Sequence, residues 1–247
     1  MTGIEGFIFD LDHTLYSLAG ASEEQFIRAC VETALEMAAS TGAPMERAEA
    51  ERLIRHAAAW DRSDLRALGI ERGYDEGRLF EIFNRHAFAE LKTTMERGRD
   101  PRLAEALAPY KGKAVIVTHG SRYWAEKVVE LLGLQDLFPP ERILALDDPA
   151  IAFQGKHESE VPFREALKIL GLPPESVAVV EDTSKNLIIP HAMGMTTVLL
   201  VWGKPVAPED HPHVDRFHDT AVDFLHSLPP PPLPAPAPGR QPPSFPL

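Results

Sequence analysis

The sequence FIFDLDHTLY at residues 7–16 places two aspartates, Asp10 and Asp12, directly after an apolar run that begins at Ile4. Short apolar runs rich in Ile and Phe predict a buried β-strand. We therefore expect residues 4–9 to form a strand that ends where the carboxylates begin. In open parallel α/β sheets, ligands bind at the carboxyl ends of the strands, so both aspartates stand where a reaction is expected.

Two carboxylates this close repel each other unless a cation lies between them or one of them holds a proton. Oxygen ligands of this kind suit Mg²⁺, which commonly binds one or two carboxylates together with a substrate phosphate. The alternative is a surface loop with two solvated acids. Residues further along the chain decide between a metal site and a solvated loop.

Apolar runs that alternate with helical patterns follow further along the chain. Strands are predicted at residues 113–117, 142–146, 177–180 and 196–201, and helices at 101–109, 124–132, 161–170 and 186–193. Strands that alternate with helices predict an α/β fold with a doubly wound parallel sheet.

The segment between the first two predicted strands contains no convincing strand. Helices are predicted there at residues 25–39, 45–60, 63–68 and 78–92, with a turn region at 69–77. We expect residues 18–99 to form a small helical cap inserted into a core made of residues 1–17 and 100–228. Such a cap excludes water and completes a site, although a bundle that only stabilises the core would show the same pattern.

The last 19 residues, 229–247, include ten prolines, which predicts a disordered or polyproline-like tail. Such a tail can bind a peptide-recognition domain, or it can be a solvated extension without a partner.

Composition limits the classes of function. The 247 residues carry a formal net charge of −12, which argues against a nucleic-acid polymer as a partner. The single cysteine, Cys30, excludes an internal disulfide and is interpreted as a core residue. No signal peptide and no apolar run of membrane-spanning length is evident, so we expect a cytoplasmic protein that does not bind a membrane.

Polar residues that could bind a metal ion or a phosphate follow four of the predicted strands. They are Asp10 and Asp12 after the first, Thr118 after the second, Lys156 in the loop beyond the third, and Glu181 and Asp182 after the fourth. Each has an ordinary explanation: a threonine can cap a helix, a lysine is commonly solvated, and two acids suit a first helical turn. Their order along the chain favours one shared site.

This order resembles the haloacid dehalogenase-like superfamily, in which Mg²⁺-dependent phosphatases predominate. The likeness covers residues 4 to about 201. Asp10-x-Asp12-x-Thr14 is similar to its first motif, Thr118 to its second, Lys156 to its third, and Glu181-Asp182 with Asn186 to its fourth. The helical insert resembles that superfamily's first type of cap.

Within the superfamily, the chain resembles pyrimidine 5′-nucleotidases most. The stretches that carry this likeness are residues 9–16, 65–68, 181–186 and 194–198. The sequence also departs from the pattern. His13 and His119 stand where such proteins often have asparagine, and His157 follows the lysine where proline is common.

The resemblance implies a mechanism. Asp10 would attack phosphorus as a nucleophile, and Asp12 would act as general acid and then base. Mg²⁺ would bind Asp10, the backbone carbonyl of Asp12, Asp182 and, directly or through a neighbour, Glu181. Thr118 and Lys156 would hold phosphoryl oxygens, with Thr14, His119 and Asn186 in support. In the cap, Arg62, Arg66, Tyr74 and His86 are the residues to inspect for contact with the leaving group.

The predicted function is a phosphatase for a small phosphorylated substrate, which the resemblance implies to be a pyrimidine nucleoside 5′-monophosphate. A phosphatase or mutase for a sugar phosphate or another small metabolite is the alternative. A dehalogenase needs neither an acid for its leaving group nor Mg²⁺, so Asp12 and the acidic pair argue against it. A binding protein that acts through the tail would leave the cluster of acids without a task.

Overall fold

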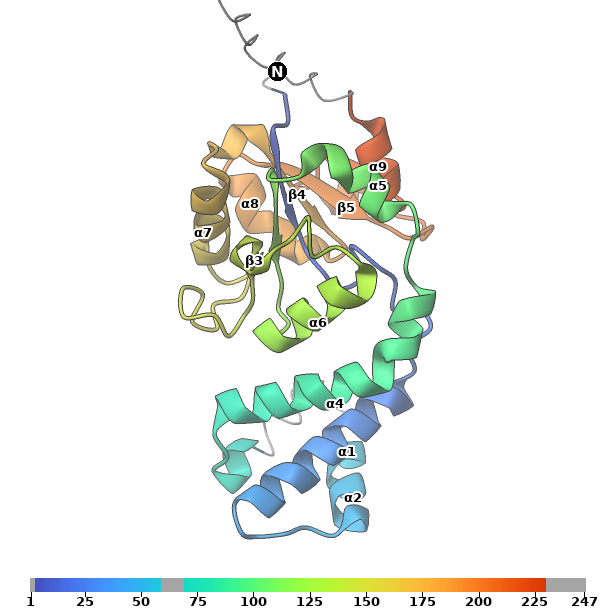
Figure 1. Cartoon of the computed structure of the whole chain (residues 1–247), viewed down its shortest axis with the longest axis vertical. Coiled ribbons are helices and arrows are strands. Elements are labelled where there is room, and N and C mark those ends of the chain that lie inside the picture. Colours follow the sequence, from blue (N-terminus) through green and yellow to red (C-terminus); the bar gives the residue numbers. More distant parts are fainter. Residues whose placement is uncertain (1–2, 59–68, 230–247) are drawn as a thin grey trace, which may run out of the picture.

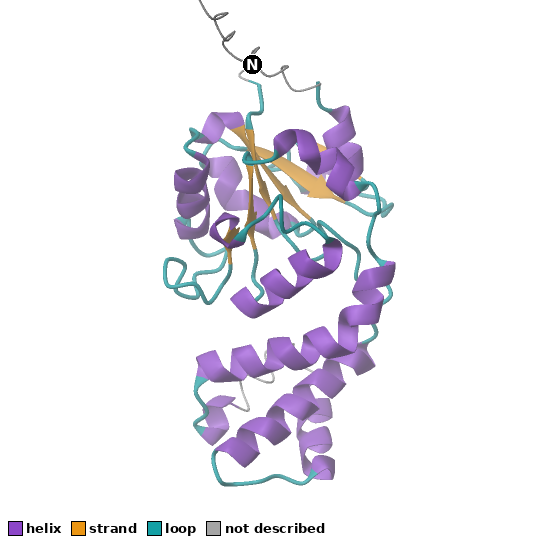
Figure 2. Cartoon of the chain, in the orientation of Figure 1, coloured by secondary structure: helices purple, strands orange, loops and turns teal. Residues whose placement is uncertain are grey.

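The computed structural model describes residues 3–58 and 69–229, and it contains one six-stranded parallel sheet (Figures 1 and 2). The strand order is β3-β2-β1-β4-β5-β6, so β1 lies at the centre with later strands on both sides. This confirms the predicted doubly wound parallel sheet. The strands are β1 Gly6–Phe9, β2 Ala114–Val117, β3 Ile143–Leu144, β4 Val177–Glu181, β5 Thr196–Leu200 and β6 Arg216–His218.

Helices cover both faces of the sheet. They are α5 Leu103–Leu107, α6 Arg122–Leu132, α7 Val161–Leu170, α8 Ile188–Ala192 and α9 Ala221–Ser227. Alternate residues of β1 point to opposite faces. Phe7 and Phe9 pack in the apolar core beside α5, α6 and α9, whereas Ile8 packs with Phe163 of α7. Since both faces of β1 are buried, the strand is apolar throughout, as its sequence predicts.

The segment between β1 and β2 contains helices, turns and loops and no named strand among its described residues. Its long helices are α1 Glu23–Ser40, α2 Arg47–Ala58 and α4 Glu76–Arg97, and residues 69–72 are also helical where a turn was predicted. The three helices share an apolar cluster that includes Ile27, Ile54 and Ile82. They form a layer beyond the end of β1 (Figure 1). The boundaries predicted for cap and core remain predictions.

The cap helices also contact the sheet domain. Phe88 of α4 packs edge-on against Trp124 of α6, with ring centroids 6.1 Å apart. Leu91 and Met95 of α4 belong to the same apolar cluster as Phe7 and Phe9. The cap is therefore fixed to the core at one end of α4.

Three further parts of the predicted secondary structure differ from the structure. Strand β6 and helix α9 were not predicted. The helix expected at 186–193 is a 3₁₀ turn, Ser184–Leu187, followed by the short α8. The predicted helix at 63–68 and the proline-rich tail beyond Pro229 lie outside the described residues. Within residues 3–58 and 69–229, no helix combines the length and the apolar composition that a membrane span requires.

Candidate active site

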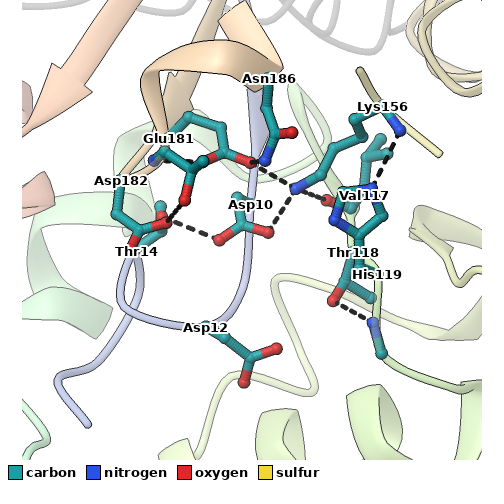
Figure 3. Close-up of polar contacts among 12 residues, drawn as sticks. Asp10, Asp12, Thr14, Val117, Thr118, His119, Lys156, Glu181, Asp182 and Asn186 are labelled. Carbon is teal, nitrogen blue, oxygen red and sulfur yellow. Dashed lines mark hydrogen bonds and ion pairs between the residues drawn. The ribbon is translucent and has the colours of Figure 1, made fainter. Parts of the chain in front are cut away.

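The register of the sheet brings the predicted residues together at one edge. Phe9 of β1 is paired with Ile116 of β2 and Val180 of β4, so the residues that follow these three are neighbours. Asp10 extends this pairing, because its backbone N–H donates to Val180 O at 2.9 Å. Figure 3 shows Asp10, Glu181, Asp182 and Lys156 converging on one point.

Lys156 is the centre of the polar cluster. Its ammonium donates to Asp10 Oδ1 at 2.5 Å and to Glu181 Oε1 at 2.6 Å, and also to Val117 O at 3.2 Å. The residue is only 2% exposed. Burial alone would lower the pKa of Lys156, but the two carboxylates raise it above its ordinary value. The lysine therefore stays charged and links the end of β1 to the end of β4.

The carboxylates outnumber this single cation. Asp10, Glu181 and Asp182 each offer an oxygen within 4.8 Å of the others. Burial raises the pKa of Asp10 well above its usual range, against the opposing effect of Lys156. Burial and the charge of Glu181 raise the pKa of Asp182 to about 6. The site thus holds more negative charge than Lys156 offsets, which is the condition that a divalent cation relieves.

Glu181 is held from several sides. Oε1 accepts from Lys156 and from Asn186 Nδ2 at 2.7 Å, and Oε2 accepts from the backbone N–H of Thr183 at 2.7 Å. Burial would raise the pKa of Glu181, but Lys156 and these hydrogen bonds keep it below its ordinary value. Asn186 Oδ1 is buried and has no hydrogen-bond partner among the described residues. Three carboxylates next to an amide oxygen without a hydrogen-bond partner fit a cation that prefers oxygen ligands, such as Mg²⁺.

The side chain of Asp12 lies apart from this cluster (Figure 3). Its Oδ1 accepts a hydrogen bond from Trp124 Nε1 at 2.8 Å and another from the hydroxyl of Tyr16. Burial raises the pKa of Asp12 above its ordinary value, and these two hydrogen bonds oppose that rise without cancelling it. The Asp12 carboxylate is absent from the group of described side chains able to hold a metal, so its predicted metal contact is left to the backbone carbonyl.

Tyr16 and Trp124 also belong to the site, although neither is predicted from the sequence as a site residue. Tyr16 is fully buried four residues after Asp12, and Trp124 lies 112 residues away on α6. The spacing of Tyr16 from Asp12 in the motif was a usable signal. Nothing in the sequence pairs Trp124 with Asp12, since that contact depends on how α6 packs.

The supporting residues lie around Asp10 and Lys156. Thr14 donates its hydroxyl to Asp10 Oδ2 at 3.0 Å. Thr118 does not cap α6; that part is taken by Ser121, whose Oγ accepts from Trp124 N at 3.1 Å. Instead, Thr118 Oγ1 accepts a hydrogen bond from the backbone N–H of Gly120 at 2.9 Å. The hydroxyl proton of Thr118 therefore points away from Gly120.

His119 joins two of the loops. Its Nε2 accepts a hydrogen bond from the backbone N–H of Lys156 at 3.0 Å, which places the ring proton on Nδ1. Burial and the nearby charge of Lys156 lower the pKa of His119 to about 4. The ring is thus neutral near pH 7. His157 packs against it edge-on, with centroids 5.8 Å apart.

His13 has a left-handed backbone, with φ of 58°. Asparagine, aspartate and histidine adopt this conformation more readily than other side chains that carry a Cβ. The carbonyl of His13 accepts a hydrogen bond from Trp202 Nε1, and its ring Nδ1 accepts from Leu18 N at 3.2 Å. Histidine in place of asparagine at position 13 therefore still suits the left-handed backbone of this turn.

Of the four cap residues with a predicted contact to the leaving group, the two that the structure describes, Tyr74 and His86, do not join the site. Arg62 and Arg66 lie outside the described residues, as do residues 65–68. Tyr74 packs against the apolar cluster of the cap. His86 Nε2 lies 2.9 Å from Glu36 Oε2 on the surface of the helical layer.

Comparison with solved structures finds the same fold in proteins of diverse activity. One is a HAD family hydrolase from Deinococcus radiodurans R1 with bound phosphate and sodium, with 17% identity and a TM-score of 0.52 over 91% of this chain and 94% of that one. Another, provisionally named a β-phosphoglucomutase, from Thermotoga maritima, has 20% identity and a TM-score of 0.57 over 90% and 97%. A dehalogenase with an intermediate complex has 16% identity and a TM-score of 0.54 over 92% and 98%.

At these identities, the solved structures support the fold alone. No curated protein sequence matches the chain. The family model of haloacid dehalogenase-like hydrolases, however, matches residues 4–194, which include all four motifs. The chain therefore belongs to the haloacid dehalogenase-like hydrolases.

Proposed function

We propose that the chain is a Mg²⁺-dependent phosphomonoester hydrolase that forms an aspartyl phosphate on Asp10. The observation that carries this proposal is the buried lysine bridge at the end of β1, in which Lys156 Nζ donates to both Asp10 and Glu181. A fixed ammonium beside a nucleophilic carboxylate can neutralise a phosphoryl oxygen as the dianion approaches.

The metal would be held by Asp10 and Asp182, with the backbone carbonyl of Asp12 as the further ligand expected from the motif. Glu181 would serve mainly to fix Lys156 and Asn186, because its oxygens already accept three hydrogen bonds. When bound, Mg²⁺ would withdraw charge from the phosphoryl oxygens and lower the repulsion among the acids.

In the first step, an oxygen of Asp10 attacks phosphorus, and the bond from phosphorus to the ester oxygen breaks. The leaving oxygen takes the electron pair of that bond and a proton from Asp12. Tyr16 and Trp124 both donate to Oδ1 of Asp12, which leaves Oδ2 for the proton transfer. The pKa of Asp12 is raised by burial, and a carboxyl that is protonated at higher pH is suited to the acid role.

In the second step, water attacks the aspartyl phosphate, and Asp12 takes a proton from that water. The bond between phosphorus and the Asp10 oxygen breaks, which restores the carboxylate and releases inorganic phosphate. Thr118 and Lys156 hold phosphoryl oxygens in both steps. Thr14 positions Asp10 by its hydrogen bond to Oδ2.

For the substrate, we propose a pyrimidine nucleoside 5′-monophosphate, on the likeness of residues 9–16, 181–186 and 194–198 to that subfamily. A sugar phosphate or another small phosphorylated metabolite is the alternative. The T. maritima relative with a mutase name shares the fold at 20% identity, which supports no choice of substrate. Carbon–halogen cleavage needs no acid for its leaving group, so Asp12 would have no role in it.

The test is phosphate release from UMP, CMP, dUMP, AMP, GMP and common sugar phosphates, with Mg²⁺ and with EDTA. We expect release that depends on Mg²⁺ and is lost in Asp10→Asn, while Asp136→Asn at an exposed position retains it. Preference for UMP and CMP would support the nucleotidase proposal, and preference for a sugar phosphate would support the alternative. If Asp10→Asn retained most of its activity, the proposed nucleophile would be wrong.

A further inference from the structure

A cavity of about 440 Å³ lies between the cap and the sheet domain, next to the proposed phosphate site. Its cap wall includes Leu79, Phe80 and Phe83 of α4, and its core wall includes Leu146, Phe153 and His119. A volume of this size is typical of pockets for small organic molecules. The lining is largely apolar, which is unusual for a site that only has to hold a phosphate.

The cavity is adjacent to the phosphate site through two residues of its lining. His119 and Gly155 both line it. His119 Nε2 accepts from the backbone N–H of Lys156, and Gly155 directly precedes that lysine. His119 also directly follows Thr118, so the cavity lining adjoins in the chain both residues proposed to hold the phosphate, Thr118 and Lys156.

Two aromatic rings of the cavity lining meet, one from each wall. Phe153 from the loop after β3 and Phe80 from α4 pack edge-on, with ring centroids 5.9 Å apart. Phe153 is 45% exposed, which is high for a phenylalanine. Both Ala152 and Phe153 have left-handed backbones, with φ of 49° and 59°. Residues other than glycine, asparagine, aspartate and histidine adopt this conformation rarely, and such strain persists where the surrounding structure enforces it.

The strained loop is fixed by its own hydrogen bonds. The backbone N–H of Ala152 donates to Asp148 O at 2.8 Å, and that of Phe153 donates to Leu146 O at 2.9 Å. The ring of Phe153 is thus presented to the cap instead of to the core. An aromatic ring held in the wall of a pocket suits stacking against a planar ring of a ligand.

The charges on the lining are acidic. Glu76 and Glu158 line the cavity, and among its described lining residues there is no lysine or arginine. His119 is uncharged near pH 7, since burial and Lys156 lower its pKa to about 4. A leaving group that carries a second phosphate or a carboxylate would meet like charge here.

We propose that this cavity binds the leaving group of the substrate and selects phosphate monoesters whose alcohol carries an aromatic or heteroaromatic ring and no second anionic group. The proposal rests on the phosphatase function proposed above, because it assigns the leaving-group site of that reaction. It includes pyrimidine nucleosides and excludes sugar bisphosphates. Phe153 is the residue that would determine the preference from the core side, and Phe80 from the cap side.

The test compares three esters of primary alcohols: ethyl phosphate, benzyl phosphate and 4-carboxybenzyl phosphate. We expect the wild-type enzyme to prefer benzyl phosphate to the other two. Phe153→Ser should lower kcat/KM for benzyl phosphate about tenfold, as expected for the loss of one stacking partner, with little change for ethyl phosphate. Phe80→Ser should act in the same direction. Ile70→Ser, at a cap position that is 74% exposed and outside the lining, is the matched control.

A second readout separates this proposal from the proposed function. Saturation-transfer NMR with benzyl alcohol reports occupation of the cavity without any reaction, and the signal should fall in Phe153→Ser. If no ester is hydrolysed but this signal persists and depends on Phe153, the phosphatase function is wrong and the cavity assignment holds. If ethyl and benzyl phosphate are hydrolysed equally and Phe153→Ser changes neither, the cavity assignment is overturned and the phosphatase function stands.

Discussion

Lys156 Nζ lies 2.5 Å from Asp10 Oδ1, although the two residues are 146 positions apart in the chain. The contact joins the end of the central strand β1 to a loop beyond β3, and both side chains are buried. A buried ion pair of this kind has little effect when both partners are present, but the loss of one partner leaves a buried charge unpaired. The pair therefore links the stability of the fold to the chemistry of the site.

The variant Lys156→Met tests this link. Its side chain has a similar length and no charge, so Asp10 and Glu181 lose the cation between them. We expect phosphate release to fall at least about a hundredfold and the free energy of unfolding to fall by about 3–5 kcal/mol. Denaturant titration and a phosphate-release assay measure the two effects.

Lys168→Met is the matched control, because Lys168 forms an ion pair with Glu165 on the surface and its side chain is 70% exposed. Its loss should change the free energy of unfolding by less than about 1 kcal/mol. Equal stability of Lys156→Met and the wild type would contradict the view that the buried acids carry charge in the folded protein.

The meeting of Asp10, Lys156 and Glu181 could be predicted from the sequence, because parallel strands end at one edge of a sheet. Strands β1 and β4, which lead to Asp10 and Glu181, are buried on both faces and therefore read as continuous apolar runs, whereas Lys156 comes from the loop beyond β3. Strand β6 is different: it has three residues, Arg216–His218, and is paired with β5 alone. Its identity as a strand depends on that pairing and not on its own pattern.

Other features of the site depend on packing between distant elements. The contact from Trp124 to Asp12 spans 112 residues and exists because α6 lies beside the loop after β1. The left-handed backbone at Ala152 and Phe153 has no signal in the residue types, since neither is a residue that favours it. Left-handed His13, by contrast, stands where asparagine is common, which is a signal that the sequence does contain.

Tyr16→Phe tests the role of Asp12 as the acid. The variant removes the hydroxyl that donates to Asp12 Oδ1 and retains the bond from Trp124. Because that hydrogen bond lowers the pKa of Asp12, its loss should raise this pKa, and the basic limb of the pH profile of kcat/KM should move to higher pH. Looser positioning of Asp12 should also lower kcat about tenfold.

Tyr123→Phe is the control for that variant, since it removes a hydroxyl from the residue next to Trp124 on α6. Its pH profile should match that of the wild type. A fall in activity of Tyr16→Phe without movement of the basic limb would show that Asp12 is not the group that protonates the leaving oxygen.

His119 should make stability depend on pH. Its folded pKa of about 4 lies below its ordinary value of 6.5. The unfolded chain therefore binds more protons than the folded protein between these two values, and stability is lost as pH falls through that window. Lys156, Glu181, His157 and Lys185 are the charged groups that act on this ring.

Comparison of the wild type with His119→Asn isolates this effect. Asparagine does not titrate, so the loss of unfolding free energy between pH 7.5 and pH 5 should be about 2 kcal/mol smaller in the variant. NMR titration of the ring in the wild type should give a midpoint near pH 4. A midpoint near the ordinary value of 6.5 would contradict the hydrogen bond from the backbone N–H of Lys156 to Nε2.

The turn at His13 yields the last prediction. With φ of 58°, this residue needs a side chain that tolerates the left-handed region, and a β-branched residue there is strained by about 1–2 kcal/mol. His13→Val should therefore lower the free energy of unfolding by about that amount. His13→Asn should stay close to the wild type, because asparagine tolerates the same φ and its amide oxygen is an acceptor for Leu18 N, as Nδ1 of the histidine is. Denaturant titration of both variants compares them directly, and equal stability of the valine and asparagine variants would contradict the role of the backbone at this position.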